Sequence, residues 1–157
     1  MKVVILSLLI SSCCGGVSDL IPDSIFGYLQ SVGVQGKVIC NGKPLKNAGL
    51  LLYELGTSNT LLNVAVSNED GAFRLRGTGD GWFRLRTRLE FLHRCNYNGP
   101  CAAMTYKNIP SDYAVYGRTD KVVKFFDVVM DVSNTTRKTG GFYDCRFDPS
   151  SGKWNEL

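Results

Sequence analysis

Four of the six cysteines and the single histidine are the side chains of this 157-residue sequence that could do chemistry. The cysteines are Cys40, Cys95, Cys101 and Cys145, and His93 lies two residues before Cys95. Such residues bind zinc, act as nucleophiles or, for cysteines, form disulfides. The segment HRCNYNGPC fits zinc poorly, because five residues separate Cys95 from Cys101, whereas paired structural zinc ligands usually stand two to four apart.

The N-terminus predicts the compartment and so decides between these chemistries. Residues 1–16 hold one positive residue, Lys2, then the largely apolar run Val3–Ile10 and then small residues, the layout of a secretory signal peptide. The apolar run is much shorter than the ~20 residues needed to span a bilayer. We therefore expect a secreted, extracellular protein, and cleavage would remove Cys13 and Cys14.

The four remaining cysteines are an even number in an oxidising compartment, which predicts two disulfides with three possible pairings. A thiolate cluster would be oxidised there, so we expect no metal site. His93 is more often a hydrogen-bonded core residue than a ligand or a base. With the cysteines paired and no G-x-S-x-G motif, the sequence offers no activated nucleophile, so we expect no catalytic residue and no cofactor.

The charge excludes a further class of function. The formal net charge is +4, and loss of Lys2 lowers it to about +3. Nucleic-acid-binding domains carry much denser positive charge. We therefore expect no binding to nucleic acid.

The elements that position these residues are predicted to be strands, because apolar residues alternate with polar ones between turn signals. The predicted strands cover residues 34–40, 48–54, the two arms of a hairpin over 64–76, and 82–95, 103–110, 124–132 and 142–147. The hairpin turns at Asp70-Gly71, with Phe73 and Leu75 facing inward. Residues 111–117 predict a short helical turn.

Seven to eight short strands joined by turns predict an all-β fold, an antiparallel β-sandwich of the immunoglobulin-like or transthyretin-like kind. We expect the signal peptide over 1–16, an N-terminal segment over 17–29, the β-sandwich over 30–148 and a C-terminal tail over 149–157.

The clearest alternation runs over residues 82–95. Its inward positions are Phe83, Leu85, Leu89 and Phe91. Its outward positions carry three arginines: Arg84, Arg86 and Arg88.

Several segments resemble the nematode transthyretin-like family of extracellular proteins. The stretch VQGKVICNGKP fits the family's V-x-G-x-x-x-C-N-G-K-P start, and SNEDGAFRLRG fits its hairpin. Leu89–Asn96 fits its L-x-I-x-H-x-C strand, while Cys101, Ile109-Pro110 and Tyr143–Cys145 fall where the family has equivalents. The resemblance covers residues 30–145.

This resemblance implies two face-to-face four-stranded sheets, ordered D-A-G-H and C-B-E-F. Placing the chain on that order implies the disulfides Cys40–Cys95 and Cys101–Cys145, each joining one sheet to the other. It also implies an extracellular binding or adaptor protein, because some members recognise membrane lipid or cell-surface receptors. The alternative is a carrier of a small hydrophobic ligand or hormone. Hydrolysis of 5-hydroxyisourate is the weakest reading, because its enzymes need two histidines and a C-terminal Tyr-Arg-Gly-Ser.

The candidate binding surface is the outward face of residues 82–95 and its neighbour. There the three arginines would lie beside the apolar residues Leu51, Tyr53 and Leu92. Such a face suits anionic phospholipid head groups or an acidic receptor. The plainer interpretation is an ordinary solvated face of arginines with β-compatible stems. Arg74 and Arg76 belong to the other sheet.

Asn134-Thr135-Thr136 is an N-glycosylation acceptor on a predicted turn between strands G and H. A glycan at Asn134 would hinder edge pairing through strand H. We therefore expect a monomer.

Overall fold

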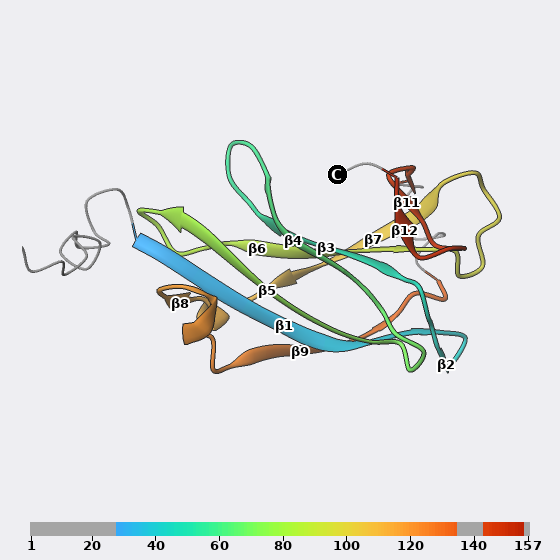
Figure 1. Cartoon of the computed structure of the whole chain (residues 1–157), viewed down its shortest axis with the longest axis horizontal. Helices are drawn as coiled ribbons and strands as arrows, with labels where there is room; N and C mark the ends of the chain where they lie inside the picture. The colour runs from blue at the N-terminus through green and yellow to red at the C-terminus, as the bar shows by residue number, and fades with distance from the viewer. Residues whose placement is uncertain (1–27, 135–142, 156–157) are drawn as a thin grey trace, which may run out of the picture.

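The computed structural model describes residues 28–134 and 143–155, which form strands and two short 3-10 turns (Figure 1). The expected signal peptide lies outside the described residues. The strands are β1 (Tyr28–Cys40), β2 (Lys43–Pro44), β3 (Gly49–Glu54), β4 (Thr60–Val66), β5 (Ala72–Gly81), β6 (Thr87–His93), β7 (Ala102–Ile109), β8 (Val115–Tyr116), β9 (Phe125–Asp131), β10 (Tyr143–Asp144), β11 (Phe147–Asp148) and β12 (Lys153–Trp154). The 3-10 turns are η2 (Ser111–Tyr113) and η3 (Thr119–Lys121). The all-β prediction is confirmed.

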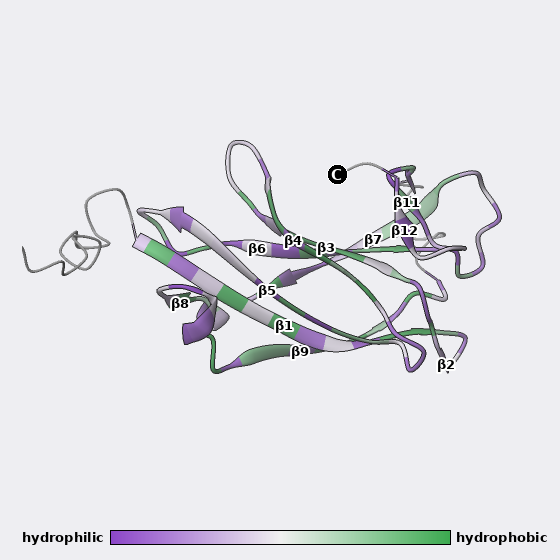
Figure 2. Ribbon diagram, in the orientation of Figure 1, coloured by the Kyte–Doolittle hydropathy of each residue, from purple (hydrophilic) through white to green (hydrophobic). Residues whose placement is uncertain are grey.

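The first sheet is built around β1, whose hydrophobic and hydrophilic residues alternate along the strand (Figure 2). Strand β5 pairs with β1 antiparallel, whereas β9 pairs with it parallel. The short strands β2 and β8 also pair with β1. The pairing is antiparallel, as expected, except between β1 and β9, which run parallel. The chain crosses from β7 of the other sheet and passes through β8 before β9, so no hairpin joins β9 to β1 and forces it to run antiparallel.

The second sheet has the order β10-β7-β6-β3-β4. Tyr143–Asp144, expected as strand H beside β9, instead pairs with Ala102–Ala103 at the β7 edge. The Cys101–Cys145 disulfide, with Cα atoms 4.6 Å apart, ties these two strands directly together. This disulfide therefore lies within one sheet, which corrects the expected inter-sheet position. Cys40–Cys95 does join the two sheets, as expected, from the end of β1 to the residues after β6.

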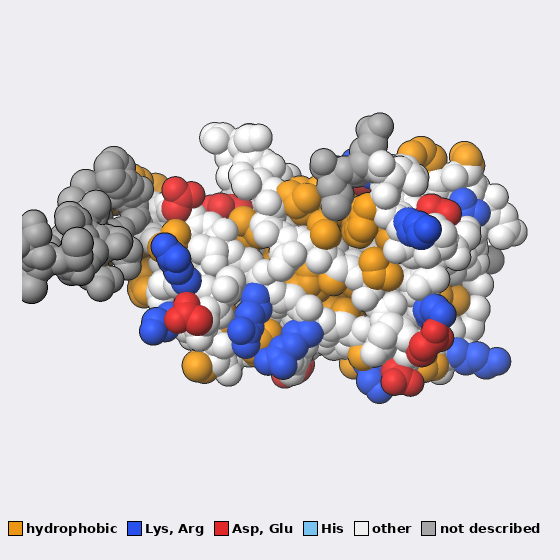
Figure 3. Space-filling view, viewed as in Figure 1, with side chains coloured by type: hydrophobic (Ala, Val, Ile, Leu, Met, Phe, Trp, Pro, Cys, Tyr) orange, Lys and Arg blue, Asp and Glu red, His pale blue; other side chains and the backbone are white. Residues whose placement is uncertain are grey.

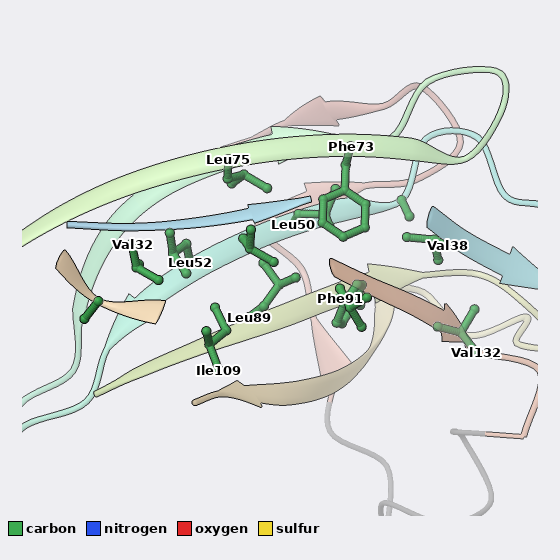
Figure 4. Packing of buried hydrophobic residues seen from close by; sticks show 14 of the residues in the cluster. Val32, Val38, Leu50, Leu52, Phe73, Leu75, Leu89, Phe91, Ile109 and Val132 are labelled. Atoms are coloured by element: carbon green, nitrogen blue, oxygen red, sulfur yellow. The ribbon is translucent and has the colours of Figure 1, made fainter. Parts of the chain in front are cut away.

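The core fills the space between the sheets, and its labelled side chains point into that space from both sides (Figure 4). The rings of Phe73 and Phe91 meet edge to face with centroids 6.0 Å apart. The expected inward positions Leu75, Leu85 and Leu89 are buried there. Burying each such side chain contributes roughly 1.5–3 kcal/mol.

The C-terminal strands form a two-stranded hairpin, β11–β12, so residues 149–155 are its turn and second strand rather than a tail. The Phe147 and Trp154 rings have centroids 4.5 Å apart. A Cβ atom at Gly49 would lie 2.8 Å from the Phe147 ring, so this glycine allows the ring to lie directly on β3. The hairpin thus covers the outer face of the second sheet, where Leu51 and Leu92 lie beneath it. No helix in residues 28–134 or 143–155 is long and apolar enough to cross a membrane.

Candidate binding surface

The three arginines expected to form one outward row do not lie on one strand. Strand β5 ends at Gly81 and β6 begins at Thr87, so Arg84 and Arg86 lie in the segment between the two strands. Only Arg88 belongs to β6. The strand alternation that defined the row therefore does not extend through residues 82–86.

Arg88 is committed to contacts inside the protein. Its Nη2 atom lies 2.7 Å from Oε1 of the buried Glu90, and its guanidinium lies over the Tyr106 ring, 5.1 Å from the centroid. Burial raises the pKa of Glu90, while the charge of Arg88 acts to lower it. Breaking such a pair leaves an uncompensated buried charge. Arg88 is therefore a structural residue.

The apolar part of the expected surface is closed. Leu51 and Leu92 are 0% exposed, because Phe147 and its hairpin pack over them. Tyr53 is half-buried, and its hydroxyl accepts a hydrogen bond of 3.4 Å from Nη2 of Arg146. The sequence placed these residues on the correct face of the sheet, but that face is covered.

Arg84 and Arg86 are exposed at one end of the sandwich, where β1 begins and β5 ends (Figure 1). Arg84 forms an exposed ion pair of 3.1 Å with Asp112, which contributes little stability. No ion pair involves the Arg86 side chain among residues 28–134 and 143–155, where its carbonyl oxygen accepts a backbone hydrogen bond from Leu55. Both guanidinium groups are therefore accessible to a partner.

Two large aromatic side chains, Trp82 and Phe83, line the same recess as these two arginines, and sequence reasoning missed them. Phe83, expected in the core, is 88% exposed, and Trp82 is 70% exposed. The Tyr28 ring packs edge-on against the rings of Trp82 and Tyr116, with centroids 6.4 and 5.8 Å apart. We call this surface the aromatic–arginine end: Tyr28, Trp82, Phe83, Arg84, Arg86 and Tyr116.

Buried Gln30 holds the protruding segment in place. Its side-chain amide donates a hydrogen bond of 2.8 Å to the carbonyl oxygen of Phe83. Its amide oxygen accepts one of 3.0 Å from the backbone N–H of Leu85, whose side chain is buried in the core. These two hydrogen bonds fix the backbone at Phe83 and at Leu85. Trp82 and Phe83 therefore project from a preorganised segment.

A recess of about 350 Å³ lies beside the projecting rings. Two segments line it, and their lining residues are Glu54, Leu55 and Gly56 from the first and Gly81, Trp82, Phe83, Arg84 and Arg86 from the second. Burial, and secondarily the charge of Asp80, raise the pKa of Glu54. The recess therefore combines aromatic, cationic and carboxylic groups.

The chemistry-bearing residues from the sequence serve the fold. Cys40, Cys95, Cys101 and Cys145 are disulfide-bonded in the pairs that the resemblance implied. His93 is buried, its Nδ1 accepts a hydrogen bond of 3.2 Å from the Cys95 N–H, and burial lowers its pKa to about 4. Within the described part of the chain, no three His, Cys, Asp or Glu residues are grouped to hold a metal ion.

Asn134 is exposed in the turn that follows β9. The two threonines of its acceptor sequence lie outside the described residues. Because Tyr143–Asp144 pairs with β7, a glycan at Asn134 would not face the edge of a strand H beside β9. The argument that a glycan blocks edge pairing, on which the expected monomer rested, therefore no longer applies. Asn134 remains a predicted N-glycosylation acceptor.

Comparison with known proteins identifies relatives. Residues 35–110 match the model of the transthyretin-like family. Transthyretin-like protein 5 of Caenorhabditis elegans is 31% identical over 123 residues, which cover 76% of this chain and 82% of that protein. Transthyretin-like protein 33 of the same organism is 30% identical over 105 residues, covering 64% and 72%. Among solved structures, a 9R-lipoxygenase from Cyanothece matches 66% of this chain and 16% of its own, with 17% identity and a TM-score of 0.35, too weak to inform fold or function.

Proposed function

The chain belongs to the transthyretin-like family, and from this premise we propose that it is a secreted, non-catalytic binding protein that docks on anionic lipid surfaces. The aromatic–arginine end makes the contact. The observation that carries the proposal is the exposure of Trp82 and Phe83 directly beside the accessible Arg84 and Arg86.

This combination fits the interface of a bilayer. Trp and Tyr rings favour the head-group level, where one part of the ring is apolar and the other reaches water. Phe83 would insert its ring between acyl chains and lose unfavourable contact with water. Each arginine near an anionic surface adds about 1 kcal/mol of attraction. Because the Gln30 hydrogen bonds fix the segment, little conformational entropy remains to be lost on docking.

Secretion is supported by the signal-like residues 1–16 and by the two disulfides, which persist in oxidising compartments. The absence of catalysis is supported by the burial of His93, the only histidine, which leaves it without access to a substrate.

A small ligand in the recess beside Glu54 is the second candidate, because that recess holds about 350 Å³ next to two aromatic rings. A specific small ligand would compete with docking on vesicles, since both would use Trp82 and Phe83. A protein receptor with an acidic surface is the remaining partner class.

Co-sedimentation with vesicles tests the proposal. The mature, oxidised protein should sediment with phosphatidylserine-containing vesicles at physiological salt and not with phosphatidylcholine alone. The W82S/F83S and R84Q/R86Q variants should each lose this binding, whereas V129S, which changes an exposed valine on β9, should retain it. Equal binding by W82S/F83S and the unchanged protein would overturn the proposal. Failure to bind either vesicle would shift the assignment to a protein receptor.

A further inference from the structure

A second surface, which shares no residue with the aromatic–arginine end, carries an unneutralised pair of arginines. It is the outer face of the first sheet, opposite its core side. The strand register places Gly33 of β1 between Arg76 of β5 and Phe125 of β9. Gln35 lies similarly between Arg74 and Asp127. In Figure 3, Lys and Arg side chains gather over the middle of β1.

Gly33 makes room for the aromatic ring at the centre of this face. A Cβ atom there would lie 2.8 Å from two carbons of the Phe125 ring and 2.6 Å from Cγ1 of Val122. The ring therefore occupies the space above β1 that any other residue would fill. It reaches the arginines of β5, which lie across β1 from its own strand.

Phe125 holds both guanidinium groups. The Cζ atoms of Arg74 and Arg76 lie 4.0 and 5.0 Å from the ring centroid. Each guanidinium is attracted to the face of the ring, and a shared ring keeps two like charges close together. The arginines are thus positioned before any partner arrives.

Protein carboxylates do not neutralise this pair. No Asp or Glu in the described part of the chain forms an ion pair with either arginine. The nearby Asp127 accepts a hydrogen bond of 2.8 Å from Gln35. Arg74 and Arg76 also line a recess of about 420 Å³ together with Asn63, whose side chain donates a hydrogen bond of 2.7 Å to the carbonyl oxygen of Arg76. An external anion would therefore relieve the repulsion between the two cations.

We propose that Arg74 and Arg76, held by Phe125 over Gly33, bind the sulfate groups of a sulfated polysaccharide. Guanidinium groups match tetrahedral oxyanions through paired N–H donors. The face is open along the strands and also presents the exposed Lys37, which suits an extended chain with repeated anionic groups. The choice of polysaccharide rests on the proposed secretion. The site itself is independent of lipid docking, because it shares no residue with the aromatic–arginine end.

Titration with a heparin oligosaccharide tests the proposal. R74Q/R76Q should weaken binding at least about tenfold, the loss expected when charge-assisted contacts worth ~1.4 kcal/mol are removed. R84Q/R86Q removes the same charge elsewhere and should bind heparin normally while failing to bind phosphatidylserine vesicles. Neither the unchanged protein nor either double variant should bind unsulfated hyaluronate. Equal loss of heparin binding in both double variants would show that binding depends on overall charge alone, and the proposed site would then be wrong. Loss of vesicle binding alone in R74Q/R76Q would also overturn it.

The role of the ring is tested without changing charge. F125A should weaken heparin binding several-fold while the dependence of affinity on salt keeps its slope, because the number of cations is unchanged. V129A changes an exposed residue on the same strand and should bind normally. The arrangement is wrong if F125A and V129A bind heparin equally well.

Discussion

The side chain of Gln30 donates a hydrogen bond to the carbonyl oxygen of Phe83, linking the start of β1 to the segment that enters β6. Gln30 is only 3% exposed, yet the Phe83 ring beyond it is 88% exposed. A buried polar residue thus supports an exposed aromatic one. This relationship explains how a segment without strand structure keeps two large rings in water.

Replacing Gln30 by Ala should leave the Phe83 carbonyl and the Leu85 N–H without their partner. We expect a loss of about 1–3 kcal/mol in the free energy of unfolding and weaker binding to phosphatidylserine vesicles. Q35A, which removes an exposed hydrogen bond to Asp127, should change stability by less than about 0.5 kcal/mol. Denaturant unfolding gives both values. Comparable losses in the two variants would show that the Gln30 hydrogen bonds do not hold the Phe83 segment in place.

The hairpin at the C-terminus predicts a contrast between two phenylalanines. F147A should lower the free energy of unfolding by about 3–5 kcal/mol, because Phe147 is buried over Leu51 and Leu92. The same change at the exposed Phe83 should have little effect on stability. Urea denaturation of both variants tests this. If F147A is as stable as the unchanged protein, the packing of the hairpin on Leu51 and Leu92 does not contribute to stability.

The disulfides should contribute similarly to stability, because they close loops of 55 and 44 residues. Removing either pair by double Cys→Ser substitution should cost roughly 2–4 kcal/mol. A peptide map without reductant should link Cys40 to Cys95 and Cys101 to Cys145. Recovery of a Cys40–Cys145 peptide would invalidate the strand arrangement.

His93 should make the protein less stable in acid. Its pKa is about 4 in the folded state and 6.5 ordinarily, so the unfolded chain takes up a proton first as pH falls. The contribution is present above pH 6.5 and is lost between pH 6.5 and about 4, amounting to roughly 3 kcal/mol. Glu90, whose pKa is raised, acts in the opposite direction.

The comparison with H93Q isolates the histidine, because Gln retains an acceptor for the Cys95 N–H but does not titrate in this range. The stability difference between the two proteins should change with pH in this window. A constant difference from pH 7 to 4 would show that His93 does not titrate abnormally.

The alternation of apolar residues predicted most strands and their inward faces, because burial on one side of a sheet imposes a period of two. It failed at Phe83, where the chain leaves the strand geometry. The predicted strand began at Trp82, whereas β6 begins only at Thr87, after a segment that no turn signal separates from the strand.

Other features depend on contacts distant in sequence. Leu51 and Leu92 lie on the expected face, but only the folded hairpin around Phe147 shows that this face is covered. Strands of two residues, such as Tyr143–Asp144, are too short to show any periodicity. The pairing of this strand with β7 is instead held by the Cys101–Cys145 bond. The sequence therefore predicted a binding surface on the face of the second sheet, whereas the structure exposes the candidate residues at the end of the sandwich.

Tryptophan fluorescence tests the central claim most directly. The sequence has two tryptophans, so W154F leaves Trp82 as the only reporter. Addition of phosphatidylserine vesicles should shift its emission to shorter wavelength, and acyl chains brominated near the head group should quench it. If the protein binds these vesicles while Trp82 emission stays unchanged and unquenched, the aromatic–arginine end is not the membrane contact and the account is wrong.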